Sequence, residues 1–472
     1  GEPMLGLAIA WHCMRSGRKE EAGEQLIRGG NEAIARSALV EAETALRSGV
    51  KTVPKKYQGD VEDLLLYVLV DQGRYTEARQ MIPEEVLSGT PITTMRSGLL
   101  TIARAGASSP HSINGQLHEL RSFISGNPPP ALALRALVAA AHLIDSVGTP
   151  EHHDWLLASI DALPGDGEWH SSILLLKAQA LYHARALTQA EALLNRLAED
   201  DSKSTRPLVH EGRISLGLGV CLTARGMYAE ADGHFARAQA IAAKAGAMTL
   251  ERNAVSNRVL CHFRLGRYEQ ARKLASGTFP SDGSQSFIRH WLAILGIRAC
   301  VEAEMQLTDE LSRTIVAGDN LTAGMPASPT CDMWQLMVAD ALFRSGSVKE
   351  ALRRAQSTLR QSGPPPLQIA GRMARWSGIL LANQPSELLN GILASATELL
   401  PTVDCIDRLE IATAALTTTV GPADNRTSYL QVVEEAARQL PRETVTYLER
   451  FRVSPAGTSS PAKATSRHAS SR

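Results

Sequence analysis

Gly226-Met227-Tyr228-Ala229-Glu230-Ala231 is the stretch that decides the fold of this chain of 472 residues. Its pattern is a glycine, an aromatic or aliphatic residue two places on, and an alanine five places on. The pattern recurs in three further segments: Gly73-Arg74-Tyr75-Thr76-Glu77-Ala78, Gly266-Arg267-Tyr268-Glu269-Gln270-Ala271 and Gly346-Ser347-Val348-Lys349-Glu350-Ala351. A short unit that repeats at a fixed period can bury its apolar face only against its neighbours. The repetition therefore predicts a solenoid of helical hairpins.

The repeat has a period of roughly 40 residues, which lies within the range typical of helical-repeat arrays. Ala231 and Ala271 stand one period apart, and Ala351 follows two periods after Ala271. A degenerate copy that has lost its glycine and alanine is therefore expected around Leu311. Glycine tolerates the positive φ that closes a tight turn between two antiparallel helices. Alanine lets the second helix approach the first closely, at roughly 8–10 Å between helix axes.

The sequence around Gly226 resembles the tetratricopeptide repeat at eight framework positions: Leu218, Gly219, Leu222, Gly226, Tyr228, Ala231, Phe235 and Ala238. A period of roughly 40 residues, rather than the usual number of about 34, looks like the longer-helix variant in bacterial signal-transduction ATPases and in transcription activators of the maltose-regulon-activator type. The resemblance implies an all-α fold, a tetratricopeptide-type α-solenoid of about ten helix pairs. Residues 17–42 and 437–451 are similar to helices beside the nucleotide-binding and output modules of such regulators.

The expected domain organisation is one helical-repeat domain over residues 1–453. Within it, residues 1–164 hold divergent repeats, residues 165–400 hold the best-matching repeats, and residues 401–453 form closing helices. Residues 454–472 are small, polar and basic, a composition that predicts a disordered tail or linker.

Further copies and helix pairs fill the rest of the chain. Gly17 with Ala22 opens a first copy, and Ala190 stands about one period before Ala231. Helix pairs are also expected at 93–105 with 116–124, at 131–147 with 152–162, at 369–382 with 386–400, and at 425–451. Ser386 is expected to start a helix, because serine caps helix N-termini. Prolines are expected between the helices, at Pro54, Pro83, Pro91, Pro128, Pro129, Pro130, Pro150, Pro164, Pro280, Pro364, Pro365 and Pro366.

Composition and charge argue against several partners. The chain has 49 basic and 49 acidic residues and a formal net charge of zero, so no field draws it to DNA, RNA or an anionic membrane. No stretch approaches 18 uninterrupted apolar residues. The apolar start at Met4 has no basic segment before it and is interpreted as a helix face rather than a signal peptide, which favours the cytoplasm. Because Gly1 is not an initiator methionine, we expect the chain to begin inside a longer gene product.

Motifs for catalysis, cofactors and metals are missing from the sequence. No glycine is followed directly by lysine, so a phosphate-binding P-loop is absent. Gly217-Leu218-Gly219 is better explained by close helix packing than by nucleotide binding. Glu151-His152-His153-Asp154 is interpreted as a helix start with a capping acid, because adjacent side chains on a helix diverge. The six cysteines never approach Cys-x-x-Cys spacing, and Cys221 and Cys261, one repeat apart, indicate small buried side chains. No cofactor is expected.

The resemblance to tetratricopeptide arrays implies that the first helix of each pair lines a concave groove that holds the ligand. Carrying the groove positions over to this chain gives the following candidates: Arg213, Val220, Asn253, Ser256, Asn257, Arg264, Asp340, Phe343 and Arg344. Asn253 and Asn257 lie one helical turn apart, flanked by Arg213 and Arg264. Because asparagine both donates and accepts hydrogen bonds and arginine binds carboxylates bidentately, this set suits a peptide backbone or a carboxylate. A solvated helix face is the alternative interpretation.

These patterns predict a protein-interaction and signal-sensing region of a cytoplasmic bacterial regulator, connected with signal transduction and transcription regulation. The groove would hold a peptide, a protein or a small effector, without catalysis in this chain. One alternative is the regulatory half of an AAA or STAND ATPase or of a protein kinase, with the catalytic part upstream. A second alternative is a free-standing scaffold or co-chaperone adaptor. No direct contact with nucleic acid or membrane is expected, and the oligomeric state stays open.

Overall fold

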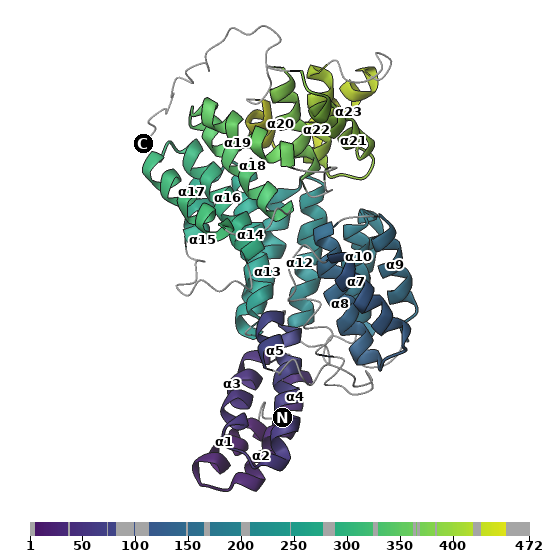
Figure 1. Ribbon diagram of the computed structural model, residues 1–472, viewed down its shortest axis with the longest axis vertical. Helices are drawn as coiled ribbons and strands as arrows, with labels where there is room; N and C mark the ends of the chain where they lie inside the picture. Colours follow the sequence, from purple (N-terminus) through teal and green to yellow (C-terminus); the bar gives the residue numbers. More distant parts are fainter. Residues whose placement is uncertain are drawn as a thin grey trace. The chain divides into compact units, whose positions relative to one another are not determined.

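The computed structural model describes residues 5–35, 38–72, 74–81, 99, 113–147, 150–164, 170–199, 208–245, 247–276, 288–323, 329–361, 365, 369–382, 385–418 and 426–449. Within these residues every regular element is an α-helix (Figure 1). Helix follows helix in antiparallel pairs joined by short turns. The fold is therefore an all-α, tetratricopeptide-type solenoid, as the sequence predicts.

The described residues form two compact units. Unit 1 takes them up to His262, from Glu269 to Ile294 and from Gly324 to Thr330. Unit 2 takes them from Phe263 to Tyr268, from Leu295 to Ala323 and from Cys331 onward. The two units are defined by their compactness and do not test the predicted three-part division of residues 1–453, which remains a prediction.

The helices that begin in unit 1 are α1 (Leu5–Arg15), α2 (Lys19–Ala35), α3 (Leu39–Val50), α4 (Lys55–Asp71), α5 (Tyr75–Gln80), α7 (Ile113–Ser125), α8 (Pro130–Val147), α9 (Pro150–Asp161), α10 (His170–His183), α11 (Leu187–Glu199), α12 (Leu208–Ala224), α13 (Tyr228–Ala245), α14 (Met248–Arg264), α16 (Ile288–Glu304) and α18 (Pro329–Arg344). The helices that begin in unit 2 are α15 (Tyr268–Ser276), α17 (Thr308–Thr322), α19 (Val348–Gln361), α20 (Ala370–Leu381), α21 (Glu387–Glu398), α22 (Cys405–Thr417), α23 (Arg426–Gln439) and α24 (Arg442–Glu449).

The glycine turns have the geometry that the repeat pattern predicts. Gly17, Gly226, Gly266 and Gly346 have φ angles of 79°, 80°, 69° and 89°. After α12, the Gly226 amide donates to the Thr223 carbonyl at 2.9 Å, and the Met227 amide donates to the Leu222 carbonyl at 3.0 Å. These bonds satisfy carbonyl groups at the helix end that have no partner within the helix. The turn thus ends one helix and starts the next while pairing two of the carbonyl groups at the end of α12.

Two other turns have the same geometry without glycine. Arg185 and Gln306 have φ angles of 62° and 59°. At the second turn the Leu307 amide donates to the Glu302 carbonyl at 2.9 Å, as Met227 does to Leu222. Positive φ therefore recurs once in every period, at positions 185, 226, 266, 306 and 346. The degenerate copy predicted around Leu311 is confirmed.

Small residues let the paired helices approach closely. Ala231, Ala271 and Ala351 are completely buried. A Cβ atom placed on Gly219 would lie 2.7 Å from the aromatic ring of Phe235 on α13, so any other residue there would force that ring to move. The interpretation of Gly217-Leu218-Gly219 as a packing feature is thereby confirmed.

Other helix boundaries also follow the sequence. Ser386 caps α21, where its hydroxyl accepts a hydrogen bond from the Leu389 amide at 3.4 Å. The closing pair is present as α23 and α24. Pro130 and Pro150 were expected between helices, but they are the first residues of α8 and α9. Proline is favoured at that position because its fixed φ suits the first turn and its missing N–H group leaves no bond unmade.

Some expectations fall on residues outside the described ranges. They concern Gly73, the helix at 93–105 apart from Leu99, and the tail at 454–472. Among the described helices, none combines the length and the apolar character needed to cross a membrane.

Candidate functional site

Four of the predicted groove residues lie on the first helices of two successive pairs in unit 1, and we call this set the polar row. The polar row consists of Arg213 on α12 and of Asn253, Ser256 and Asn257 on α14. Arg213 is exposed and the other three are half-buried, as is Val220 on α12. The side-chain amide of Asn257 donates to the backbone carbonyl of Asn253 at 2.8 Å. This bond orients the Asn257 amide and leaves its oxygen as an acceptor.

The other four predicted groove residues belong to unit 2 and are corrections to the sequence analysis, because unit 2 uses them for its own packing. Arg264 is only 8% exposed, and its guanidinium lies 5.5 Å from the Phe263 ring centre. Arg344 forms a buried ion pair with Glu304. Phe343 is half-buried and packs edge-on against Trp376 with ring centres 5.8 Å apart.

Asp340 lies deepest among them, with no exposed surface. Its carboxylate accepts hydrogen bonds from Arg372 Nε at 2.9 Å, Arg375 Nη2 at 2.5 Å and Trp376 Nε1 at 2.8 Å. Arg375 also donates to Glu410 Oε1 at 2.8 Å. Sequence spacing places Asp340 correctly on a first helix, but it cannot show that α20 supplies three donors to its carboxylate.

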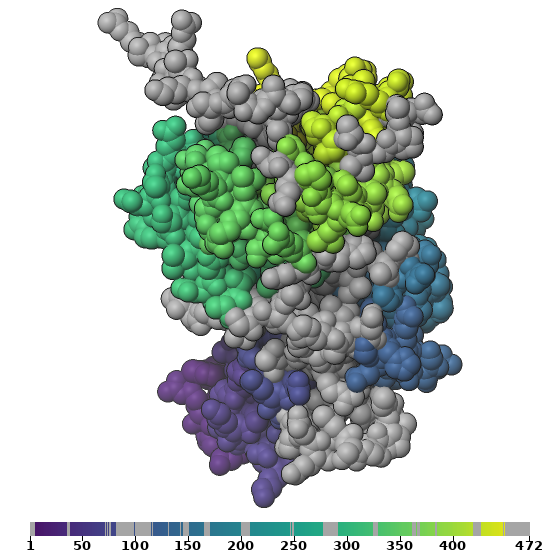
Figure 2. Space-filling view, turned by 45° about the horizontal axis from the view of Figure 1, so that its top comes forward, coloured from purple at the N-terminus to yellow at the C-terminus, as the bar shows by residue number. Residues whose placement is uncertain are grey.

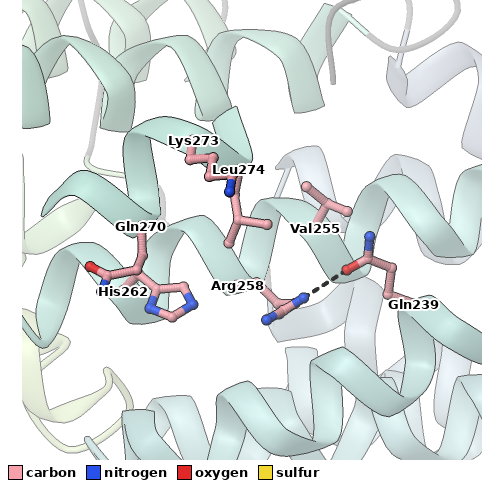
Figure 3. Close-up of a pocket in the computed structure, with 7 residues that line it drawn as sticks. All are labelled: Gln239, Val255, Arg258, His262, Gln270, Lys273 and Leu274. Atoms are coloured by element: carbon pink, nitrogen blue, oxygen red, sulfur yellow. Dashed lines mark hydrogen bonds between the residues drawn. The ribbon is translucent and has the colours of Figure 1, made fainter. Parts of the chain in front are cut away.

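A pocket of unit 1 that no sequence motif predicts lies between α13, α14 and α15, with a volume of about 460 Å³ (Figure 3). Its lining consists of Gln239, Val255, Arg258, His262, Gln270, Lys273 and Leu274. Leu274 points from α15 toward Arg258, and Val255 faces the same space from α14 (Figure 3). A volume of this size is typical of pockets that take a side chain or a small molecule.

Two neighbours from α13 hold the Arg258 guanidinium in place. Arg258 Nε donates to Asp232 Oδ1 at 2.8 Å, and Arg258 Nη1 donates to Gln239 Oε1 at 2.9 Å. His262 Nε2 lies 3.6 Å from the second oxygen of Asp232. The side chains of Arg258 and Asp232 are 22% and 17% exposed. The guanidinium is thus ordered before any ligand arrives, and two of its N–H groups, on Nη2, have no partner among the described residues.

Metal and thiol chemistry receive no support from the described residues. They contain no group of three or more histidine, cysteine or acidic side chains placed to hold a metal ion. Cys221 and Cys261 are buried, as the sequence predicts. Burial raises the pKa of Cys221 to about 11 and that of Cys261 to about 12, so both stay protonated at neutral pH. In α9, which begins at Pro150, His153 is buried and His152 is half-buried.

Comparisons with known proteins give likeness in structure only. No protein-family model matches the sequence, and no curated protein matches it. A Rap protein complexed with competence and sporulation factor is 13% identical, with a TM-score of 0.44 over 83% of this chain and 99% of that one. The human IFIT1 dimer with m7Gppp-AAAA is 13% identical, with a TM-score of 0.46 over 88% of this chain and 94% of that one. At TM-scores below 0.5 these likenesses carry no argument about a ligand of this chain.

Proposed function

We propose that this chain is a protein-interaction and signal-sensing region of a bacterial regulator, which binds a peptide or protein segment along the polar row of unit 1. The observation that carries the proposal is the oriented, half-exposed amide of Asn257, on the same helix as the half-exposed Asn253 and Ser256. Amides that both donate and accept suit the backbone of an extended peptide. We assign no catalysis to the chain.

The contrast with unit 2 supports a role in binding for the polar row. Two periods later, Asn253, Ser256 and Asn257 are replaced by Met333, Leu336 and Met337. Leu336 and Met337 are buried, and a Cβ atom on Gly296 would lie 2.6 Å from the Met337 sulfur. Unit 2 thus uses these positions to pack α16 against α18. Unit 1 carries polar side chains there that remain open to solvent.

The test uses peptides selected from a phage-displayed library of random dodecapeptides against the whole chain. Binders are then measured by fluorescence anisotropy on the parent and on the double variant Asn253→Ala/Asn257→Ala. We expect at least a tenfold loss of affinity in the double variant. Its melting temperature should stay close to that of the parent, because surface substitutions that disrupt no buried contact usually change stability by less than about 0.5 kcal/mol.

Asn31→Ala on α2 is the matched control. The Asn31 amide makes the same bond to the carbonyl four residues back, Ile27, at 2.9 Å. Its loss should leave peptide affinity unchanged. Equal affinity of the parent and the double variant would overturn the proposal.

A further inference from the structure

The sites between successive helix pairs can be compared between the two units position by position. Helices α12 and α16 cover residues 208–224 and 288–304, and the turns at Gly226 and Gln306 are likewise two periods apart. The starts of α13 and α17, at Tyr228 and Thr308, keep the same offset. Each residue that lines the pocket in unit 1 therefore has a counterpart two periods later in unit 2.

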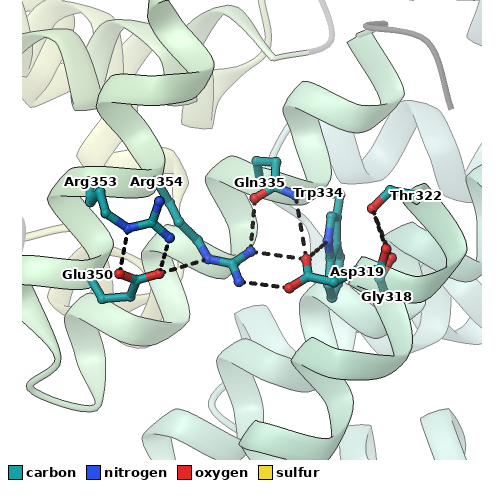
Figure 4. Close-up of polar contacts among 8 residues, drawn as sticks. All are labelled: Gly318, Asp319, Thr322, Trp334, Gln335, Glu350, Arg353 and Arg354. Carbon is teal, nitrogen blue, oxygen red and sulfur yellow. Dashed lines mark hydrogen bonds and ion pairs between the residues drawn. The ribbon is translucent and has the colours of Figure 1, made fainter. Parts of the chain in front are cut away.

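In unit 2 this site is filled by an arginine. Arg354 on α19 reaches Asp319 on α17, with Nη1–Oδ1 and Nη2–Oδ2 distances of 3.0 and 2.7 Å (Figure 4). Gln335 accepts a further hydrogen bond from Arg354 at 2.9 Å, and Trp334 Nε1 donates to Asp319 at 3.0 Å. Glu350 lies on the other side of Arg354, at 3.4 Å from its Nε atom (Figure 4). We call these residues the arginine network.

In unit 1 the counterparts are smaller or uncharged, and the site is open. Leu274 replaces Arg354, Gln239 replaces Asp319 and Val255 replaces Gln335. Gln270 and Lys273 replace Glu350 and Arg353. The pocket thus has two cationic side chains, Arg258 and Lys273, in its lining, and no carboxylate among its lining residues.

We propose that the pocket of unit 1 binds a carboxylate group. The ordered guanidinium of Arg258 offers its Nη2 atom, and Lys273 offers a second cation from α15. Val255 and Leu274 provide apolar contact for the methylene stem that carries the carboxylate. Asp232 already pairs with the Nε side of Arg258, so a carboxylate from outside would be a second partner on the Nη2 side, in a partly desolvated site where charge-assisted hydrogen bonds are strong.

The carboxylate can come from an acidic side chain of a bound peptide or from a free small acid. The first source rests on the proposed function, since the pocket would then bind an acidic side chain of the peptide held by the polar row. Short dipeptide-like probes test the chemistry without the peptide. We name N-acetyl-glutamate amide as the carboxylate probe and N-acetyl-glutamine amide as its neutral match.

The experiment is a titration of the whole chain by methyl NMR, with the Val255 and Leu274 methyl groups as reporters. We expect saturable shifts at both residues with the glutamate probe and at least tenfold weaker binding of the glutamine probe. Lys273→Ala should weaken the glutamate probe several-fold. Lys244→Ala, which removes an exposed lysine on α13, should leave it unchanged. Equal binding of the two probes, or shifts at other residues only, would overturn the proposal.

A second variant fills the pocket from within. Gln239→Asp with Leu274→Arg recreates the charge pair of Asp319 and Arg354 in unit 1. We expect this variant to melt no lower than the parent and to lose the shift of Val255 with the glutamate probe. Retained binding in the filled variant would count against the pocket.

The two proposals fail separately. Asn253→Ala/Asn257→Ala should keep its affinity for the glutamate probe. If selected peptides ignore the polar row while the glutamate probe still binds, the proposed function fails and the carboxylate site stands. If the peptides depend on the polar row but show no preference for acidic residues, and the glutamate probe does not bind, the carboxylate site fails alone.

Discussion

The site between helix pairs is open in unit 1 and filled in unit 2, although the helices that build it have the same spacing. In unit 2 the arginine network joins α17, α18 and α19 through Asp319, Gln335 and Arg354. In unit 1 the guanidinium of Arg258 comes from the middle helix and leaves a pocket of about 460 Å³ (Figure 3). The repeat thus fixes where a site can form, and a few side chains decide whether it stabilises the fold or remains available to a ligand.

The first-helix residues also differ in exposure between the units, because Asp340 of unit 2 is fully buried whereas Arg213 of unit 1 is exposed. In a space-filling view, the green and yellow-green residues of unit 2 adjoin one another on the face shown (Figure 2). Buried ion pairs of the kind made by Asp340 contribute little net stability, but removing one partner is costly. Loss of a single partner of Asp340 is therefore expected to destabilise unit 2.

The largest effect is expected from Asp319→Ala in unit 2. The change removes the acceptor of the fully buried Trp334 indole and the closer of the two carboxylate partners of Arg354. We expect a loss of about 2–3 kcal/mol in the free energy of unfolding, because two donors lose their partner. Chemical denaturation of the variant and the parent measures it.

The counterpart in unit 1 serves as the control for this change. Gln239→Ala removes one hydrogen bond to Arg258, which keeps Asp232 as its partner. Its cost should be about 1 kcal/mol or less. Equal losses for the two variants would show that the network in unit 2 is not coupled as the structure indicates.

Acid should weaken unit 2 through Asp319. Burial acts to raise the pKa of Asp319, but hydrogen bonds from Arg354 and Trp334 outweigh it and hold that pKa below its ordinary value of 3.8. A group with a lowered pKa stabilises the fold above its ordinary pKa and loses this contribution as the pH falls through the lowered value. The advantage of the parent over Asp319→Asn should be full above about pH 4 and shrink below it.

The size of this acid effect should be modest, about 1 kcal/mol, because the Asp319 side chain is 35% exposed and solvent screens the pair. Denaturation curves of both proteins between pH 2.5 and 7 measure it. Gln239 does not titrate, so Gln239→Ala gives a flat difference over the same range. A difference between the parent and Asp319→Asn that stays constant down to the lowest pH would contradict the lowered pKa.

The sequence predicts the turns well and the polar sites poorly. Turn geometry depends on a few neighbouring residues, so Gly226 and even the degenerate copy at Leu311 follow from spacing alone. Sequence spacing gives Asp340 a position on one helix and so predicts that it faces the groove. Its burial depends on Arg372 and Arg375, which belong to the later helix α20. No single motif predicts the pocket, because it depends on Leu274 occupying the position that Arg354 has two periods later. That difference is visible only when the two copies are compared.

The smallest expected effect comes from the turns that the two units share. Gln306 holds a positive φ of 59° where the equivalent turn has Gly226 at 80°. A residue with a Cβ atom lowers the stability of the folded state by about 1–2 kcal/mol in this conformation. Glycine avoids that cost, but it loses more conformational entropy on folding, which costs about 0.5–1 kcal/mol. Gln306→Gly should therefore stabilise the chain by about 0.5–1 kcal/mol and raise its melting temperature by about 1–3 °C. Gly226→Gln should lower the melting temperature by a similar amount. If the two variants shifted the melting temperature in the same direction, the equivalence of the two turns would be contradicted.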